Sequence, residues 1–212
     1  IGFGGEDGGG IYHSIYDDFY SYTHFSDTDF LYGRALAPTG GTAVLRLADA
    51  DLLPFEFADF ADTMDVYIKE LKTLAQKTQS DIVERNRQIE EGLFQAVDDP
   101  KKPLIAPQAE AVPPYLNFSP LDNASGALTR GAAEYRRALE KTNRNGSSAM
   151  TDASLADVNK LLIESERKLT NEAGLPNRPW FKHQIYAPGF YTGYAAKTMP
   201  AVREAIDQKQ WK

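Results

Sequence analysis

The residues with the clearest chemical potential are Tyr12 and His13, which closely follow three consecutive glycines at positions 8–10. Glycine lets the backbone adopt conformations that other residues avoid, and it lets a ligand or another chain approach closely. Neutral imidazole is the commonest metal ligand and the side chain that most readily moves a proton near neutral pH. The pattern therefore predicts a loop that presents reactive side chains. The alternative is a structural histidine satisfied by its neighbours.

Five ordered segments near the two ends of the chain carry a family resemblance. They are Tyr12-His13-Ser14-Ile15-Tyr16-Asp17, Tyr22-Thr23-His24-Phe25, Thr42-Ala43-Val44-Leu45-Arg46-Leu47-Ala48-Asp49, Leu53-Pro54-Phe55, and Gly174-Leu175-Pro176-Asn177-Arg178-Pro179-Trp180-Phe181-Lys182-His183-Gln184-Ile185-Tyr186-Ala187-Pro188. Together they resemble the C-terminal third of the zinc peptidases related to glutamate carboxypeptidase II and the transferrin receptor. The middle of the chain, residues 78–120, adds no motif to this resemblance.

The resemblance implies that the chain is the C-terminal part of a zinc-dependent exopeptidase acting on small peptides. By position in the family motif, His13 corresponds to a zinc ligand and Tyr12 to the catalytic tyrosine that faces the substrate carbonyl. Gly8 corresponds to backbone near the substrate. In the family, two zinc ions are held mostly by residues of an α/β domain that precedes this part of the chain. We therefore expect an incomplete zinc site, and no activity from this chain alone.

A zinc site built within the chain is the alternative, because His13 and Asp17 are four residues apart and His24 is nearby. Two residues with that spacing would share one face of a helix. The resemblance argues against this site, since the family has a non-ligand acidic residue at the Asp17 position and places His24 in a structural motif.

The residue before the predicted pocket tyrosine differs from that of the glutamate-preferring relatives. In those relatives a lysine precedes the pocket tyrosine, whereas here the pair is Gly193-Tyr194. Tyr194 could still bind a substrate carboxylate, but the positive charge is missing, so a preference for acidic C-terminal residues is in doubt. Lys197 could replace that charge only if the loop is reshaped. The second interpretation is a non-catalytic dimerisation and interaction module of the transferrin receptor type, although the Tyr12-His13 pair favours the peptidase branch.

Composition excludes several classes of protein. The chain has 212 residues, of which 42% are hydrophobic and 25% charged, as in an ordinary globular protein of one or two domains. A net charge of -7 with dispersed Lys and Arg argues against a nucleic-acid partner. Without cysteine, neither a disulfide nor a Cys-based zinc site is possible. No apolar run is long enough to cross a bilayer, so we expect no membrane contact from this chain.

The first residue, Ile1, lies inside a glycine-rich segment, which suggests truncation or processing of a longer protein. The residues themselves do not indicate the cellular compartment. The family resemblance alone suggests an extracytoplasmic or secreted location.

The proline after Leu52 and Leu53 marks a domain boundary between residues 1–51 and residues 52–212. The resemblance implies that the first part is a remnant of the peptidase domain and the second a helical dimerisation domain. The first part contains a predicted helix over residues 29–51, with a kink or break at Pro38 and the following glycines. A loop near residues 183–197 is glycine-flanked and rich in tyrosine, which makes it a plausible pocket lining. Its alternative is a polar-aromatic belt over one end of the helices.

Four apolar stripes at helical spacing predict four amphipathic helices in the second part. They lie within residues 57–75, 82–97, 121–139 and 155–169, and a short final helix begins at residue 198. Five prolines between positions 100 and 114 predict a long connector, and Ser119 and Pro120 predict the start of the third helix.

The predicted fold is therefore mainly α. It consists of a four-helix-bundle-like dimerisation domain, preceded by a remnant of an α/β zinc-peptidase domain. The partners implied by the resemblance are a second copy bound through the bundle, the missing N-terminal peptidase domain, and a small peptide substrate.

Overall fold

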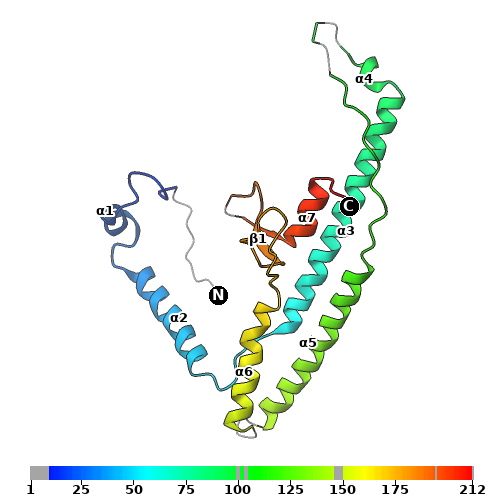
Figure 1. Cartoon of the computed structure of the whole chain (residues 1–212). Helices are drawn as coiled ribbons and strands as arrows, with labels where there is room; N and C mark the ends of the chain where they lie inside the picture. Colours follow the sequence, from blue (N-terminus) through cyan, green and yellow to red (C-terminus); the bar gives the residue numbers. More distant parts are fainter. Residues whose placement is uncertain (1–9, 99–100, 103–104, 146–149, 194, 212) are drawn as a thin grey trace. The chain divides into compact units, whose positions relative to one another are not determined.

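The computed structural model describes residues 10–98, 101–102, 105–145, 150–193 and 195–211 (Figure 1). Helices dominate the described residues, and their only sheet has two strands, which confirms a mainly α fold. The chain divides into two compact units, Ile1–Pro54 and Phe55–Lys212. Gly8 and Tyr194 lie outside the described residues.

The first unit contains the short helix α1 (Phe19–Ser21), the π-helical turn η1 (Tyr22–Ser26) and the helix α2 (Leu31–Ala48). The expected break at Pro38 is wrong, because α2 continues through this residue. Proline removes one backbone donor from a helix. Next to it, the hydroxyl of Thr39 donates a 2.8 Å hydrogen bond to the carbonyl of Ala35, so a side chain supplies a donor in this turn.

Asp27 fixes the start of α2. Its side chain is buried and accepts hydrogen bonds from the Tyr22 hydroxyl at 2.8 Å, the Gly33 amide at 2.9 Å and the Tyr32 amide at 3.1 Å. Burial alone would raise the pKa of this carboxyl, but the bonds from Gly33, Tyr22 and Tyr32 lower the pKa below its usual range. The ionised carboxylate therefore caps the first turn of α2, where free backbone amides favour a negative charge.

The second unit is built on one helix of 34 residues, α3 (Phe57–Glu90), followed by the short α4 (Leu93–Ala96). The prediction of two helices here is wrong, because the polar stretch between the two stripes is also helical. That stretch contains neither glycine nor proline, and an ion pair of 2.5 Å joins Lys77 to Asp81 one turn later. Exposed pairs at this spacing support a helix without burying apolar surface. The described residues of this unit therefore form three long helices.

The other long helices are α5 (Ser119–Asn145) and α6 (Asp152–Arg167). The connector between α4 and α5 has no helix in its described residues, as its prolines predicted. It returns along α3 (Figure 1), where the side chain of Asn86 bonds both the carbonyl of Glu110 at 2.7 Å and its amide at 3.0 Å. α5 begins at Ser119, which was predicted as the residue just before the helix, and the Ser119 amide donates a 3.0 Å hydrogen bond to the Asn117 side chain.

The main core lies between α3 and the C-terminal helix α7 (Pro200–Asp207). It consists of Met64, Ile68, Leu71, Met199 and Ile206, each at most 7% exposed. Before α7, the strands β1 (Tyr186–Pro188) and β2 (Ala196–Thr198) form an antiparallel hairpin with Pro188 opposite Ala196. None of the helices in the described part of the chain is long and apolar enough to cross a membrane.

Candidate functional site

Tyr12 and His13 lie side by side in a turn of the first unit. Their rings stack with centroids 3.9 Å apart and planes inclined by 23°. His13 has a left-handed backbone with φ of 65°, a conformation that is uncommon outside glycine. The Tyr12 side chain is 65% exposed and His13 is also exposed, so both rings face solvent in this unit. The turn therefore presents an imidazole and a phenol together.

Asp17 supports this turn through the backbone of His13. Its Oδ2 lies 3.4 Å from the His13 amide, and residues 11–17 form turns instead of a helix. The shared helix face that would place His13 and Asp17 together as ligands is therefore absent. Within the described ranges, no three His, Asp or Glu side chains come together as a possible metal site.

His24 has a structural environment. Its Nδ1 lies 2.9 Å from the Tyr20 carbonyl, and its ring stacks on the Tyr20 ring with centroids 3.9 Å apart. A carbonyl oxygen can only accept, so Nδ1 carries the proton of this bond. The imidazole is thus held against its own helical turn.

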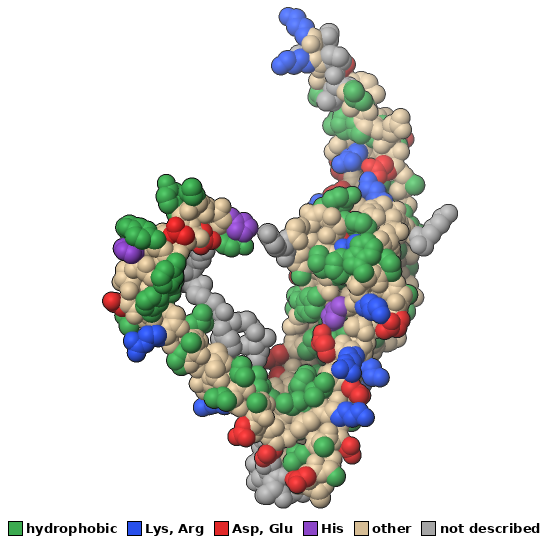
Figure 2. Space-filling view, turned by 60° about the vertical axis from the view of Figure 1, so that its left-hand side comes forward, with side chains coloured by type: hydrophobic (Ala, Val, Ile, Leu, Met, Phe, Trp, Pro, Cys, Tyr) green, Lys and Arg blue, Asp and Glu red, His purple; other side chains and the backbone are tan. Residues whose placement is uncertain are grey.

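Large apolar side chains cover the outside of the first unit. Figure 2 shows hydrophobic side chains near the two histidines of this unit. The most exposed are Ile15, Tyr16, Phe19, Phe25, Tyr32 and Leu45, each at least 69% exposed. Apolar surface of this kind is typical of a site of interaction with other polypeptide.

The predicted pocket-lining loop, near residues 183–197, covers β1, most of β2 and the hairpin tip between them. At the start of the tip, the Gly189 amide donates a 2.7 Å hydrogen bond to the hydroxyl of Thr192, which donates to the Ala195 carbonyl at 2.8 Å. Gly193 has a left-handed φ of 57°. Tyr191 is 96% exposed, so the tip presents an aromatic ring to solvent.

Lys197 is paired with a carboxylate of α7. Its Nζ forms an ion pair of 2.6 Å with Asp207 on α7, and its side chain is 21% exposed. The lysine is therefore already neutralised, and it would have to leave Asp207 to replace the cation missing before Tyr194.

Tyr186 anchors the base of the hairpin to α3. Its hydroxyl lies 3.3 Å from the hydroxyl of Tyr67. This bond and burial raise the pKa of Tyr186 to about 12. The phenol therefore stays neutral at physiological pH and keeps its hydrogen bond.

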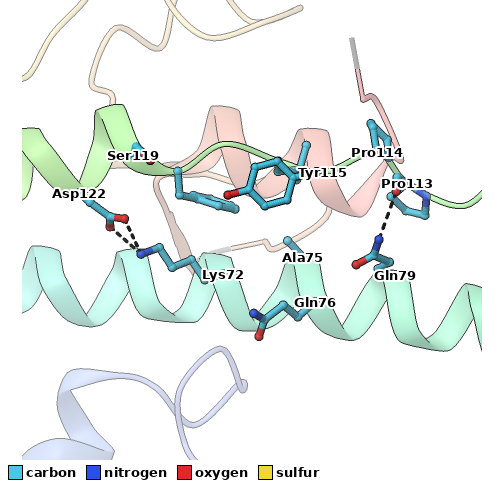
Figure 3. A pocket seen from close by; sticks show the side chains of 11 residues that line it. Lys72, Ala75, Gln76, Gln79, Pro113, Pro114, Tyr115, Ser119 and Asp122 are labelled. Carbon is cyan, nitrogen blue, oxygen red and sulfur yellow. Dashed lines mark hydrogen bonds and ion pairs between the residues drawn. The ribbon is translucent and has the colours of Figure 1, made fainter.

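A cavity of about 290 Å³ lies elsewhere in the second unit, between α3 and the connector (Figure 3). The carboxylate of Asp122 bonds Lys72 at one end, and at the other end the Gln79 side chain donates to the Pro113 carbonyl at 3.4 Å. These polar groups satisfy one another. The contacts explain how the connector is held and do not indicate a ligand.

Comparison with known proteins finds that the C-terminal helices are similar to a known domain. Residues 116–212 match the transferrin receptor-like dimerisation domain. The matched residues comprise α5, α6, the hairpin and α7, whereas α3, which packs against α5, lies before them.

The chain is also similar to named peptidases over more than nine tenths of its length. It is 30% identical over 197 residues to a probable glutamate carboxypeptidase, LAMP1, of Arabidopsis thaliana, covering 93% of this chain and 23% of the relative. It is 25% identical to a probable glutamate carboxypeptidase of Arthroderma benhamiae, covering 92% and 22%. It is 22% identical to the aminopeptidase NAALADL1 of Rattus norvegicus, covering 94% and 22%. The resemblance seen in the sequence is confirmed, and the chain spans about a quarter of each relative's length.

Two residues of the matched segment, Arg178 and Glu204, were not singled out from the sequence. They form a buried ion pair with side chains 5% and 8% exposed. They are 26 residues apart in a region without long periodic elements, so spacing could not pair them. The one signal in the sequence is a charged residue inside the run of proline and aromatic residues at positions 176–181.

Proposed function

We propose that the chain is the C-terminal part of a zinc-dependent exopeptidase that hydrolyses small peptides. Its relatives named glutamate carboxypeptidase and aminopeptidase support a peptidase. The observation that carries the proposal is the exposed, stacked pair of Tyr12 and His13. In this proposal the chain contributes one zinc ligand, part of the substrate pocket and the dimer interface.

His13 suits a metal ligand because imidazole nitrogen is a preferred donor for zinc and the ring is exposed in this unit. A catalytic zinc takes about three protein ligands and a water molecule, so one imidazole fits as part of a larger set. Two ions are expected in the intact protein, with the remaining ligands on the preceding domain. When bound, zinc polarises a carbonyl and lowers the pKa of bound water.

Tyr12 acts beside the imidazole. Stacking fixes its ring relative to His13, with 3.9 Å between the centroids. Its hydroxyl is a donor that can bond the carbonyl oxygen of a substrate held at the same centre. A donor aimed at the developing negative charge stabilises the transition state more than the substrate. Gly8 and Tyr194 complete the proposed substrate contacts.

The test uses the intact protein and a panel of dipeptides. We expect His13→Ala to abolish most activity and Tyr12→Phe to lower kcat by about 100-fold, the usual cost of losing one such donor. Tyr16→Phe is the matched control, because it removes the hydroxyl of an exposed tyrosine in the same segment. Circular dichroism checks that the helices stay folded. Unchanged turnover in His13→Ala would refute the assignment.

A second candidate is a non-catalytic dimerisation and interaction module. The match of residues 116–212 to a dimerisation domain favours it. The two candidates differ in the adjoining sequence, since only a peptidase needs a His, an Asp and an adjacent Glu-Glu pair as further ligands. Both candidates include a homodimer formed through the helices, and light scattering at several concentrations tests it. A monomer mass at every concentration would contradict the dimer.

A further inference from the structure

Arg178 is held from several sides beneath the hairpin. Its Nη2 lies 2.5 Å from Oε2 of Glu204, and its Nη1 donates to the carbonyl of Pro188. The guanidinium also lies 4.5 Å from the ring centroid of Phe190 and 5.5 Å from that of Phe181. Such contacts are attractive because an aromatic face is electronegative. Arg178 therefore joins its own turn to the end of β1 and to α7.

Glu204 completes the contact on the other side of Gly189. While Oε2 binds Arg178, Oε1 accepts a 3.1 Å hydrogen bond from the Phe190 amide. The pair thus holds the backbone carbonyl before Gly189 and the backbone amide after it. These two bonds fix the direction in which the chain leaves β1 and enters the tip.

A tight turn directs Arg178 inward. Gly174 has a left-handed φ of 68°, and a Cβ at this position would lie 2.3 Å from the Pro179 carbonyl oxygen. Only glycine allows this close approach. Within the turn, the amide of Arg178 donates a 3.0 Å bond to the Leu175 carbonyl, and Leu175 is buried. The guanidinium is thereby placed by rigid backbone.

Stability alone is a poor reason for this arrangement. Burying two charges costs free energy that their attraction offsets only in good geometry, and apolar residues of similar volume often do as well. Here Nε of Arg178 is also buried without a hydrogen-bond partner. What the pair supplies, and an apolar pair would not, is directional bonding to the backbone on both sides of Gly189.

We propose that Arg178 and Glu204 are positioning residues that fix the hairpin tip, residues 189–193, as a wall of the substrate pocket. They act through the Pro188 carbonyl and the Phe190 amide and do not contact the substrate. The inference rests on the proposed exopeptidase function. Pocket walls need such support because a displacement of about 1 Å in a binding contact can cost about 100-fold in rate.

The test compares Arg178→Lys and Glu204→Gln in the intact protein. Lysine lacks the fork that reaches two acceptors, and glutamine keeps the size of Glu204 but not its charge. The control is Glu172→Gln, which neutralises a side chain of an exposed ion pair with Lys182 in the same region. Urea unfolding of all variants shows whether the core around α3 is intact.

The first readout is hydrogen exchange of the Phe190 amide. We expect both variants to exchange about tenfold faster there than wild type, as local opening becomes easier, with unchanged amides in α3. The second readout is steady-state kinetics on two dipeptides that differ in one side chain. We expect KM to rise about tenfold with kcat nearly unchanged, and the preference between the two dipeptides to shift, because uniform binding is lost.

The possible outcomes distinguish the positioning role of the pair from the proposed exopeptidase function. Unchanged exchange at Phe190, or faster exchange with unchanged KM and preference, overturns the positioning role while the exopeptidase function stands. A wild-type protein without peptidase activity refutes the proposed function, and with it the pocket role of this pair. If Arg178→Lys fails to fold, Glu204→Gln decides, because it preserves side-chain volume.

Discussion

The Nε2 atom of His183 lies 2.9 Å from Oε1 of Glu166, which joins the C-terminal segment to α6. The other ring nitrogen, Nδ1, accepts hydrogen bonds from the amides of Ile185 at 3.2 Å and Tyr186 at 3.0 Å. Since Nδ1 accepts from two amides, the proton of the bond to Glu166 is on Nε2. His183 is thus a structural residue at the base of the hairpin.

Replacing His183 by alanine should destabilise the protein by about 1–3 kcal/mol, because two backbone donors lose their acceptor and the Ile185 amide is partly buried. Urea unfolding of the chain measures the change. Glu166→Gln is the control, since its amide oxygen can still accept from Nε2 and the side chain is 69% exposed. Equal destabilisation by both substitutions would contradict the role given to Nδ1.

Leu71→Ala should cost about 2–5 kcal/mol in the free energy of unfolding, since truncating a fully buried leucine loses apolar burial and leaves a cavity. Leu71 is 0% exposed and belongs to the core between α3 and α7. Leu161→Ala on α6 makes the same chemical change at a site that is 67% exposed, and should change stability by at most about 0.5 kcal/mol. Thermal or urea unfolding of both variants tests the difference. Similar losses would disprove this core.

Asp27→Asn should loosen the start of α2 near neutral pH. The folded-state pKa of Asp27 is lowered, so its contribution to stability is complete above the unfolded-state pKa and is lost as the pH falls through the lower, folded-state pKa. Protection of the Tyr32 and Gly33 amides from hydrogen exchange should therefore be lower in the variant at pH 7. The two proteins should converge in acid below the ordinary range of an aspartate. A difference that persists there would contradict the prediction.

The 212-residue chain should bind zinc weakly in calorimetry, because His13 offers one of about four ligands. His13→Ala should remove most of that weak heat, whereas His24→Ala should change it little, since the His24 ring is held by the Tyr20 carbonyl. Tight binding of one zinc per chain would contradict this prediction.

Local pattern predicted the features that depend on local chemistry. The face of α3 that carries Met64, Ile68 and Leu71 follows from apolar spacing, and the start of α5 was predicted to within one residue from Ser119 and Pro120. The unbroken length of α3 did not follow, because a polar helix has no apolar stripe to show it. The predicted break at Pro38 was wrong because the loss of one backbone donor did not end α2.

The candidate site also has features that the sequence predicted and features that it did not. Residue type and adjacency pointed to Tyr12 and His13, but their stacking depends on a left-handed backbone that non-glycine residues rarely adopt. The pairing of Arg178 with Glu204 depends on how the hairpin folds over α7, which no short pattern encodes.

The C-terminal end of α3 lies next to a position at which residues can be inserted. Helix α3 carries the chain to α4, and the connector comes back along the same helix (Figure 1), tied to it by the side chains of Asn86 and Gln79. Extra residues placed just after α4 would leave the register of both ties, and of α5 against α3, as it is. We expect natural and engineered insertions to be tolerated at this outer turn, which makes it a suitable place for a tag or a reporter domain.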